Sequence, residues 1–158
     1  MKYQLEQAPI AKTEMLIRKP VSEVFEAFIN PDITTKFWFT KSSGKLEQGK
    51  QVTWTWEMYN VSTPVEVKEI EKDKRIFVIW GNHDRATEVE WVFKRLDDEG
   101  TFVSITVSGF QGDGDKVVEE ALGSVAGFTW VLAGLKAYLE HNIQLNLVAD
   151  RFPKGLNQ

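Results

Sequence analysis

The sequence contains no cysteine and only two histidines, His83 and His141, among its 158 residues. The absence of cysteine excludes disulfide bonds, thiolate nucleophiles, iron–sulfur clusters and cysteine-ligated zinc sites. Two histidines cannot form a metal site built from several imidazoles. We therefore expect a protein with neither a bound metal nor a cofactor.

Basic charge and long hydrophobic runs are also scarce. Lys and Arg number 19 against 23 Asp and Glu, which gives a formal net charge of −4. Nucleic-acid binding requires clustered basic residues, whereas Lys41, Lys45 and Lys50 are scattered. No apolar run approaches the roughly 20 residues that span a bilayer, and the first residues lack the apolar segment of a secretory signal. We expect a cytoplasmic protein without nucleic-acid partners or membrane insertion.

Polar residues form no catalytic motif that can be identified from spacing. The segment 112–115 lacks the further acids of a calcium loop, so Asp113 or Asp115 is a candidate helix N-cap. His83 falls in a loop and is expected in solvent. His141 falls at the C-terminal end of the long helix, where a positive charge is favourable. The acidic residues of the strands are expected to face solvent as well: Glu57, Glu66, Glu69, Glu88 and Glu90. A β-bulge near Glu69 would reverse the direction in which its side chain points. Whether the protein is an enzyme stays open.

The residues that are present predict one α+β domain. We expect a lead-in at 1–10, a single domain at 11–148 and a tail at 149–158. A strand at 12–19 precedes two short helices, the first opened by Pro20 and the second after Pro31. Alternating apolar and polar residues then predict antiparallel strands at 52–58, 64–71, 75–80, 87–96 and 101–110. One apolar face of this curved sheet must be covered.

The cover is a long C-terminal helix. Apolar residues from Val118 to Leu139 recur at helical spacing and indicate a helix of roughly 28 residues. Gly123, Gly127 and Gly134 each cost such a helix about 1 kcal/mol relative to Ala. They indicate either close packing on the sheet or space left beside the helix, and the sequence leaves both readings open.

Several segments resemble a known family. They are Ile17 to Phe28, Pro31-Asp32, Lys36 to Trp38, Val67 to Ile70, Arg75 to Trp80, Val89 to Trp91, Gly100 to Phe110 and Phe128 to Trp130. In order and spacing they resemble the Aha1 (activator of Hsp90 ATPase) C-terminal-domain-like family of the START/Bet v 1 helix-grip superfamily. The resemblance implies a helix-grip fold with a cavity between sheet and helix. It also implies possible contact with a chaperone, and it transfers no catalytic set. Val107 stands where many members carry a histidine.

Tryptophan is in excess, with six in the chain. The indoles either fill an ordinary core or line a small-molecule site, since such sites are apolar with a few polar groups. We expect a hydrophobic or aromatic ligand to contact residues of the inner face: Trp38, Trp54, Trp56, Met58, Trp80, Trp91, Ile105, Phe128 and Leu132. The alternatives are a cyclase- or hydrolase-like enzyme and a chaperone-interacting module. Outward apolar positions of the long helix could support a homodimer.

Overall fold

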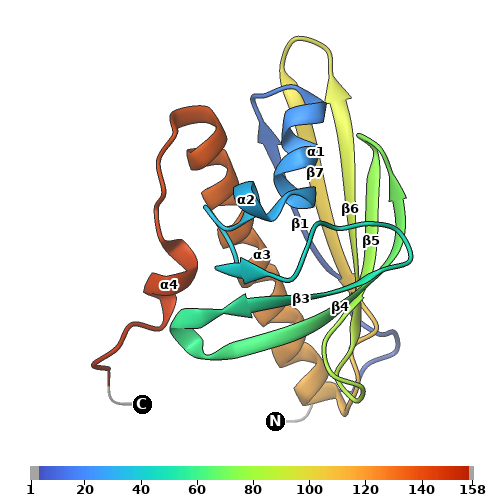
Figure 1. The fold of residues 1–158 in the computed structure, drawn as a ribbon. Coiled ribbons are helices and arrows are strands. Elements are labelled where there is room, and N and C mark those ends of the chain that lie inside the picture. Colours follow the sequence, from blue (N-terminus) through green and yellow to red (C-terminus); the bar gives the residue numbers. More distant parts are fainter. Residues whose placement is uncertain (1–3, 157–158) are drawn as a thin grey trace.

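The computed structural model describes residues 4–156 and places seven antiparallel strands in one curved sheet, in the order β1-β7-β6-β5-β4-β3-β2 (Figure 1). The strands are β1 (Ala11–Ile17), β2 (Lys41–Ser42), β3 (Gln51–Trp56), β4 (Val61–Glu71), β5 (Arg75–Trp80), β6 (Thr87–Leu96) and β7 (Gly100–Ser108). The helical elements are α1 (Val21–Ile29), α2 (Pro31–Thr34), η1 (Glu57–Tyr59), α3 (Gly114–His141) and α4 (Leu147–Arg151). This architecture confirms the predicted α+β helix-grip fold.

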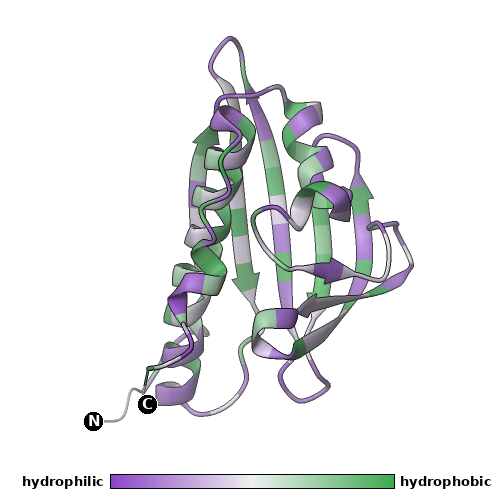
Figure 2. Cartoon of the chain, turned by 60° about the vertical axis from the view of Figure 1, so that its left-hand side comes forward, coloured by the Kyte–Doolittle hydropathy of each residue, from purple (hydrophilic) through white to green (hydrophobic). Residues whose placement is uncertain are grey.

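The alternation of residue types gives the sheet one apolar face. On β6, Val89, Trp91 and Phe93 are buried, whereas Glu88 and Lys94 on either side of this run are exposed and Glu90 within it is half-buried. Figure 2 shows the same alternation of hydrophobic and hydrophilic residues along the other long strands. The apolar face lies under α3 and α1, so the core forms between the sheet and these helices.

Helix α3 is held at both ends and along its length. The Asp113 carboxylate caps its first turn by accepting a hydrogen bond of 2.9 Å from the backbone N–H of Lys116. Thr129 shares a hydrogen bond of 2.9 Å with Thr13 of β1, and Lys136 Nζ donates to the Leu16 carbonyl at 2.8 Å. By length and composition α3 could cross a membrane, but here it packs on the sheet as the core helix.

Two local features depart from strict alternation. The strand expected to continue through Met58 ends at Trp56, and residues 57–59 form the 3-10 turn η1. The pairing of β4 with β5 shifts register between Val67 and Glu69. Glu69 faces solvent as expected, but for the opposite reason: strict alternation with the buried Val67 would point it inward, and the bulge turns it to the outer face, where its carboxylate pairs with Arg75.

The chain ends differ in detail from the expected domain limits. Helix α4 extends from Leu147 to Arg151, so the expected limit at 148 falls inside it. Residues 1–3 of the expected lead-in and 157–158 of the expected tail lie outside the described residues. Neither α4 nor the short strand β2 was anticipated from the sequence.

Candidate functional site

A cavity of about 440 Å³ lies beside α3, lined by residues between Glu120 and Val131 of this helix. Small-molecule sites in proteins typically measure about 300–1,000 Å³. The lining comes from α3, β4 to β6 with the β5–β6 loop, the segment after β7, the turn after α2, and α4: Trp38, Thr63, Trp80, Gly81, Arg85, Thr87, Phe110, Glu120, Gly123, Ser124, Gly127, Phe128, Trp130, Val131 and Val148. Elements far apart in sequence therefore form one concave site.

Glycines open the cavity on the α3 side. A Cβ atom added at Gly123 or Gly127 would meet nothing within 4 Å outside the helix's own backbone and the neighbouring residues. A Cβ at Gly134 would instead lie 3.2 Å from both the Cβ and the carbonyl oxygen of Phe37. The two readings therefore apply at different positions, although the close packing at Gly134 is against Phe37, in the turn after α2, and not on the sheet. Two leave space, and the third allows close packing.

Trp38 forms the wall between the cavity and the core. Its ring centroid lies 4.8 Å from that of Trp54, 5.5 Å from that of Phe128 and 5.9 Å from that of Trp80. The Trp80 indole N–H donates a hydrogen bond of 3.0 Å to Oγ1 of Thr87. Contacts between aromatic rings and this hydrogen bond fix the positions of the wall residues before any ligand arrives.

The structure brings some of the residues expected at the site to the cavity. Trp38, Trp80 and Phe128 line it. The others lie outside the lining: Trp54, Trp56, Met58, Trp91, Ile105 and Leu132. All of them except Met58 are buried and belong to the core, and Met58 packs against it. The tryptophans thus both fill a core and line a cavity.

One buried group in this core has no partner. The indole N–H of Trp91 is the only buried side-chain nitrogen or oxygen in residues 4–156 without a hydrogen bond. Its ring packs between Phe28 and Phe128, at centroid distances of 5.8 Å and 6.2 Å. It therefore lies behind the cavity wall.

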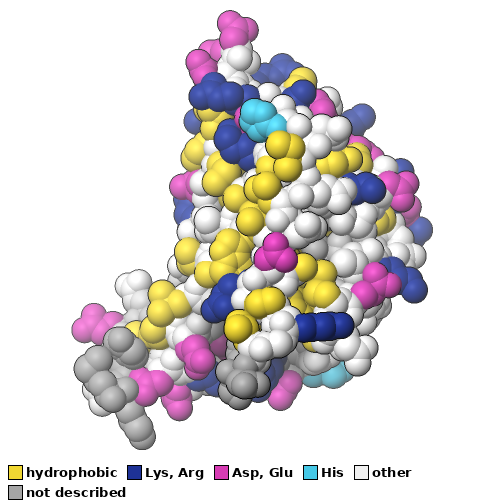
Figure 3. Space-filling view, turned by 90° about the vertical axis from the view of Figure 1, so that its left-hand side faces the viewer, with side chains coloured by type: hydrophobic (Ala, Val, Ile, Leu, Met, Phe, Trp, Pro, Cys, Tyr) yellow, Lys and Arg dark blue, Asp and Glu magenta, His cyan; other side chains and the backbone are white. Residues whose placement is uncertain are grey.

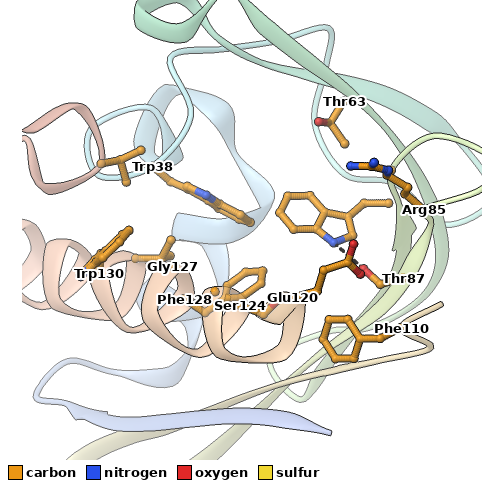
Figure 4. Close-up of a pocket in the computed structure, with 15 residues that line it drawn as sticks. Trp38, Thr63, Arg85, Thr87, Phe110, Glu120, Ser124, Gly127, Phe128 and Trp130 are labelled. Atoms are coloured by element: carbon orange, nitrogen blue, oxygen red, sulfur yellow. Dashed lines mark hydrogen bonds between the residues drawn. The ribbon is translucent and has the colours of Figure 1, made fainter. Parts of the chain in front are cut away.

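Polar side chains gather on one side of the cavity. In Figure 4, Thr63, Arg85, Thr87 and Glu120 lie on the right-hand side of the cavity, whereas Trp38 and Trp130 lie on the left. Glu120 is half-buried and Arg85 is exposed. The site is therefore amphipathic, with an aromatic end and a polar end.

Several residues that line the cavity were not predicted from the sequence. Val148 reaches the cavity because the Tyr59 hydroxyl donates to the carbonyls of Val148 and Ala149, which holds α4 against the domain. Nothing in the sequence signals this contact. Glu120 was detectable, since it shares one helix face with Gly123 and Gly127 at spacings of three and seven residues.

The remaining acids and histidines are not part of the cavity lining. His83 is exposed, and so are Glu57, Glu66 and Glu88. Within residues 4–156, no three His, Cys, Asp or Glu side chains are grouped to hold a metal ion.

Glu140 lies at the far end of α3 from the cavity, and its carboxyl links α3 to the residue that follows β1. Burial of the carboxyl raises its pKa, but hydrogen bonds from the Arg18 backbone N–H (2.9 Å) and from Lys136 Nζ (2.7 Å) lower it. The hydrogen bonds prevail, and the pKa of Glu140 lies below its ordinary value. This carboxylate therefore has a structural role in holding α3 to the end of β1.

Comparisons with known proteins agree with this architecture. Residues 18–140 match the family model "Activator of Hsp90 ATPase homolog 1-like protein". The crystal structure of protein SSP2350 from Staphylococcus saprophyticus is 31% identical, covers 87% of this chain and 96% of its own, and superimposes with a TM-score of 0.75. Protein MLL2253 from Mesorhizobium loti is 18% identical, with coverage of 85% and 99% and a TM-score of 0.75.

A third relative was solved in solution as the Aha1 dimer from Colwellia psychrerythraea. It is 17% identical to this chain, with coverage of 84% and 97% and a TM-score of 0.72. Among curated proteins, no match was found. The matches confirm the resemblance found in the sequence.

Proposed function

We propose that this chain, which belongs to the family of Activator of Hsp90 ATPase homolog 1-like proteins, binds an apolar or aromatic small molecule in the cavity beside α3. The observation that carries the proposal is the open space beside Gly123 and Gly127, facing a wall of aromatic rings. Burial of apolar ligand surface contributes about 25 cal/mol per Å², less the cost of ordering the ligand.

The ligand contacts in this proposal are Trp38, Trp80 and Phe128, together with Trp130 and Phe110. The other inner-face residues support this wall from behind, as the 4.8 Å contact of Trp54 with Trp38 illustrates. A wall built from mutually packed rings is rigid, so little ordering cost falls on the protein when a ligand binds.

Binding is favoured over catalysis by the chemistry of the lining. Among the described residues that form it, the polar side-chain groups are hydroxyls, indole N–H groups, one carboxylate and one guanidinium, and no histidine is present. Ser124 and Glu120 lie one helical turn apart, but no hydrogen bond joins their side chains in the part of the chain that the structure describes. A serine nucleophile would need such a base.

A second copy of the chain is the proposed protein partner. The relative from Colwellia psychrerythraea is described as a dimer. Large hydrophobic side chains of α3 and the segment after it are exposed: Leu122, Val125, Ile143, Leu145, Phe152 and Leu156. Figure 3 shows hydrophobic side chains in a band down this face of the molecule. Sedimentation of the wild type and of Leu145→Glu tests whether the chain forms a dimer through these side chains. Contact with a chaperone rests on the family name alone.

Native mass spectrometry of gently purified protein tests the proposed function. The expected result is a bound small molecule that is released on denaturation, or saturable one-to-one binding of an added apolar fluorescent probe. Failure of both, across a broad panel of lipophilic compounds, would contradict the proposal.

A further inference from the structure

Two charged side chains of opposite sign line the polar side of the cavity without an ion pair. Arg85 comes from the loop between β5 and β6, and Glu120 comes from the second turn of α3. In residues 4–156, neither forms a salt bridge or a side-chain hydrogen bond, with each other or with a third residue. When no ligand is bound, each charge is therefore stabilised by water and not by a protein partner.

A neutral apolar ligand would be a poor match for this side of the cavity. Such a ligand would displace water from the half-buried Glu120 carboxylate and from the Arg85 guanidinium and offer no replacement partner. Desolvating an unpaired charge is costly, and the cost grows with burial. The two charges therefore disfavour apolar ligands that offer them no polar partner.

A ligand with both a positive and a negative group satisfies the two side chains at once. A cationic group at Glu120 gains a charge-assisted hydrogen bond, and the aromatic rings that line the same cavity, among them Trp80 and Phe110, can add cation–π attraction. A carboxylate or similar anion at Arg85 accepts the paired N–H donors of the guanidinium. The Trp80 N–H is already engaged by Thr87, so it does not compete for the ligand.

We propose that the cavity selects apolar ligands whose polar end is zwitterionic, with the positive group at Glu120 and the negative group at Arg85. This rests on the proposed function, since it specifies the ligand class of the same cavity. The apolar body of the ligand lies toward Trp38 and Trp130.

Four probes that share one ring separate charge from apolar contact. They are indole, indole-3-acetate, tryptamine and tryptophan, which are neutral, anionic, cationic and zwitterionic at pH 7. Binding is measured by calorimetry. We expect tryptophan to bind about tenfold more tightly than indole, as two partly exposed ion pairs together contribute about 1.4 kcal/mol.

Variants of the two charged residues show which ligand group each residue binds. Arg85→Gln should weaken the binding of indole-3-acetate and leave the affinity for tryptamine unchanged. Glu120→Gln should weaken the binding of tryptamine and leave the affinity for indole-3-acetate unchanged. Arg95→Gln and Glu119→Gln are matched controls, since both residues are exposed and outside the lining, and they should change neither affinity.

The outcomes distinguish the two proposals. Indole binding as tightly as tryptophan, or equal affinities in Arg85→Gln, Glu120→Gln and the wild type, overturns the zwitterion proposal and leaves small-molecule binding intact. Binding of an apolar fluorescent probe with no binding of tryptophan also overturns it. Failure of every probe, including the apolar one, overturns both proposals.

Discussion

The indole N–H of Trp80 donates a hydrogen bond of 3.0 Å to Oγ1 of Thr87, its direct cross-strand partner. Trp80 is the last residue of β5 and Thr87 the first of β6, and both line the cavity. The bond holds the ring in place where the two strands diverge into the 81–86 loop. One wall of the site is thus set by a hydrogen bond between two strand ends.

Removing this hydrogen bond should loosen the wall. Thr87→Val keeps the shape of the side chain but leaves the Trp80 N–H without its partner, so we expect a loss of about 1 kcal/mol in the free energy of unfolding and weaker probe binding. Urea denaturation and a probe titration measure the two effects. Thr106→Val, on the outer face of β7, is the control for a threonine-to-valine change in a strand. Equal losses in both variants would show that the bond does not matter.

The glycines of α3 should respond differently to alanine. Gly123→Ala and Gly127→Ala meet no neighbour, so each should stabilise the helix by up to about 1 kcal/mol, or raise Tm by about 2–4 °C. Gly134→Ala places a methyl group 3.2 Å from the backbone oxygen of Phe37, which cannot easily move, and should lose most or all of that gain. Thermal unfolding followed by circular dichroism compares the three. A Gly134→Ala variant as stable as Gly127→Ala would refute the close packing.

Acid should weaken the attachment of α3 through Glu140. Its pKa is lowered in the folded state, so its contribution is fully present above the unfolded-state pKa of about 4.3 and is lost as the pH falls through the lower folded-state value. Glu140→Gln should lower the free energy of unfolding by on the order of 1–2 kcal/mol at pH 7. It should also reduce the loss of stability on acidification, which is the acid limb of the plot of unfolding free energy against pH. Denaturation curves between pH 3 and 7 measure this.

Glu119→Gln is the matched control for that profile, because Glu119 is an exposed acid on the same helix. It should reproduce the wild-type acid limb. Indistinguishable profiles for Glu140→Gln and the wild type would contradict the role given to Glu140.

Much of the fold follows from local patterns in the sequence. Alternation predicted the inner face of β6, and helical spacing with a candidate cap at Asp113 predicted α3. These patterns work because one face of each element is buried and because cap geometry is local. The family resemblance then supplied the way sheet and helix pack.

The polar side of the cavity did not follow from such patterns. Arg85 sits in a loop, and its place at the cavity depends on where β5 and β6 end relative to α3. Val148 lines the cavity because Tyr59 holds a distant segment. Each of these placements depends on contacts between residues far apart in sequence, which periodicity does not encode.

The most direct test of the central claim fills the cavity from its open side. Gly127→Leu adds an isobutyl group where a Cβ meets no neighbour, and leucine is the better helix former, so folding should be kept. Titration with an apolar fluorescent probe should give saturable binding to the wild type, binding reduced by at least about tenfold in Gly127→Leu, and an intermediate affinity in Gly127→Ala. Equal probe affinity in the wild type and a folded Gly127→Leu variant would contradict ligand binding in this cavity.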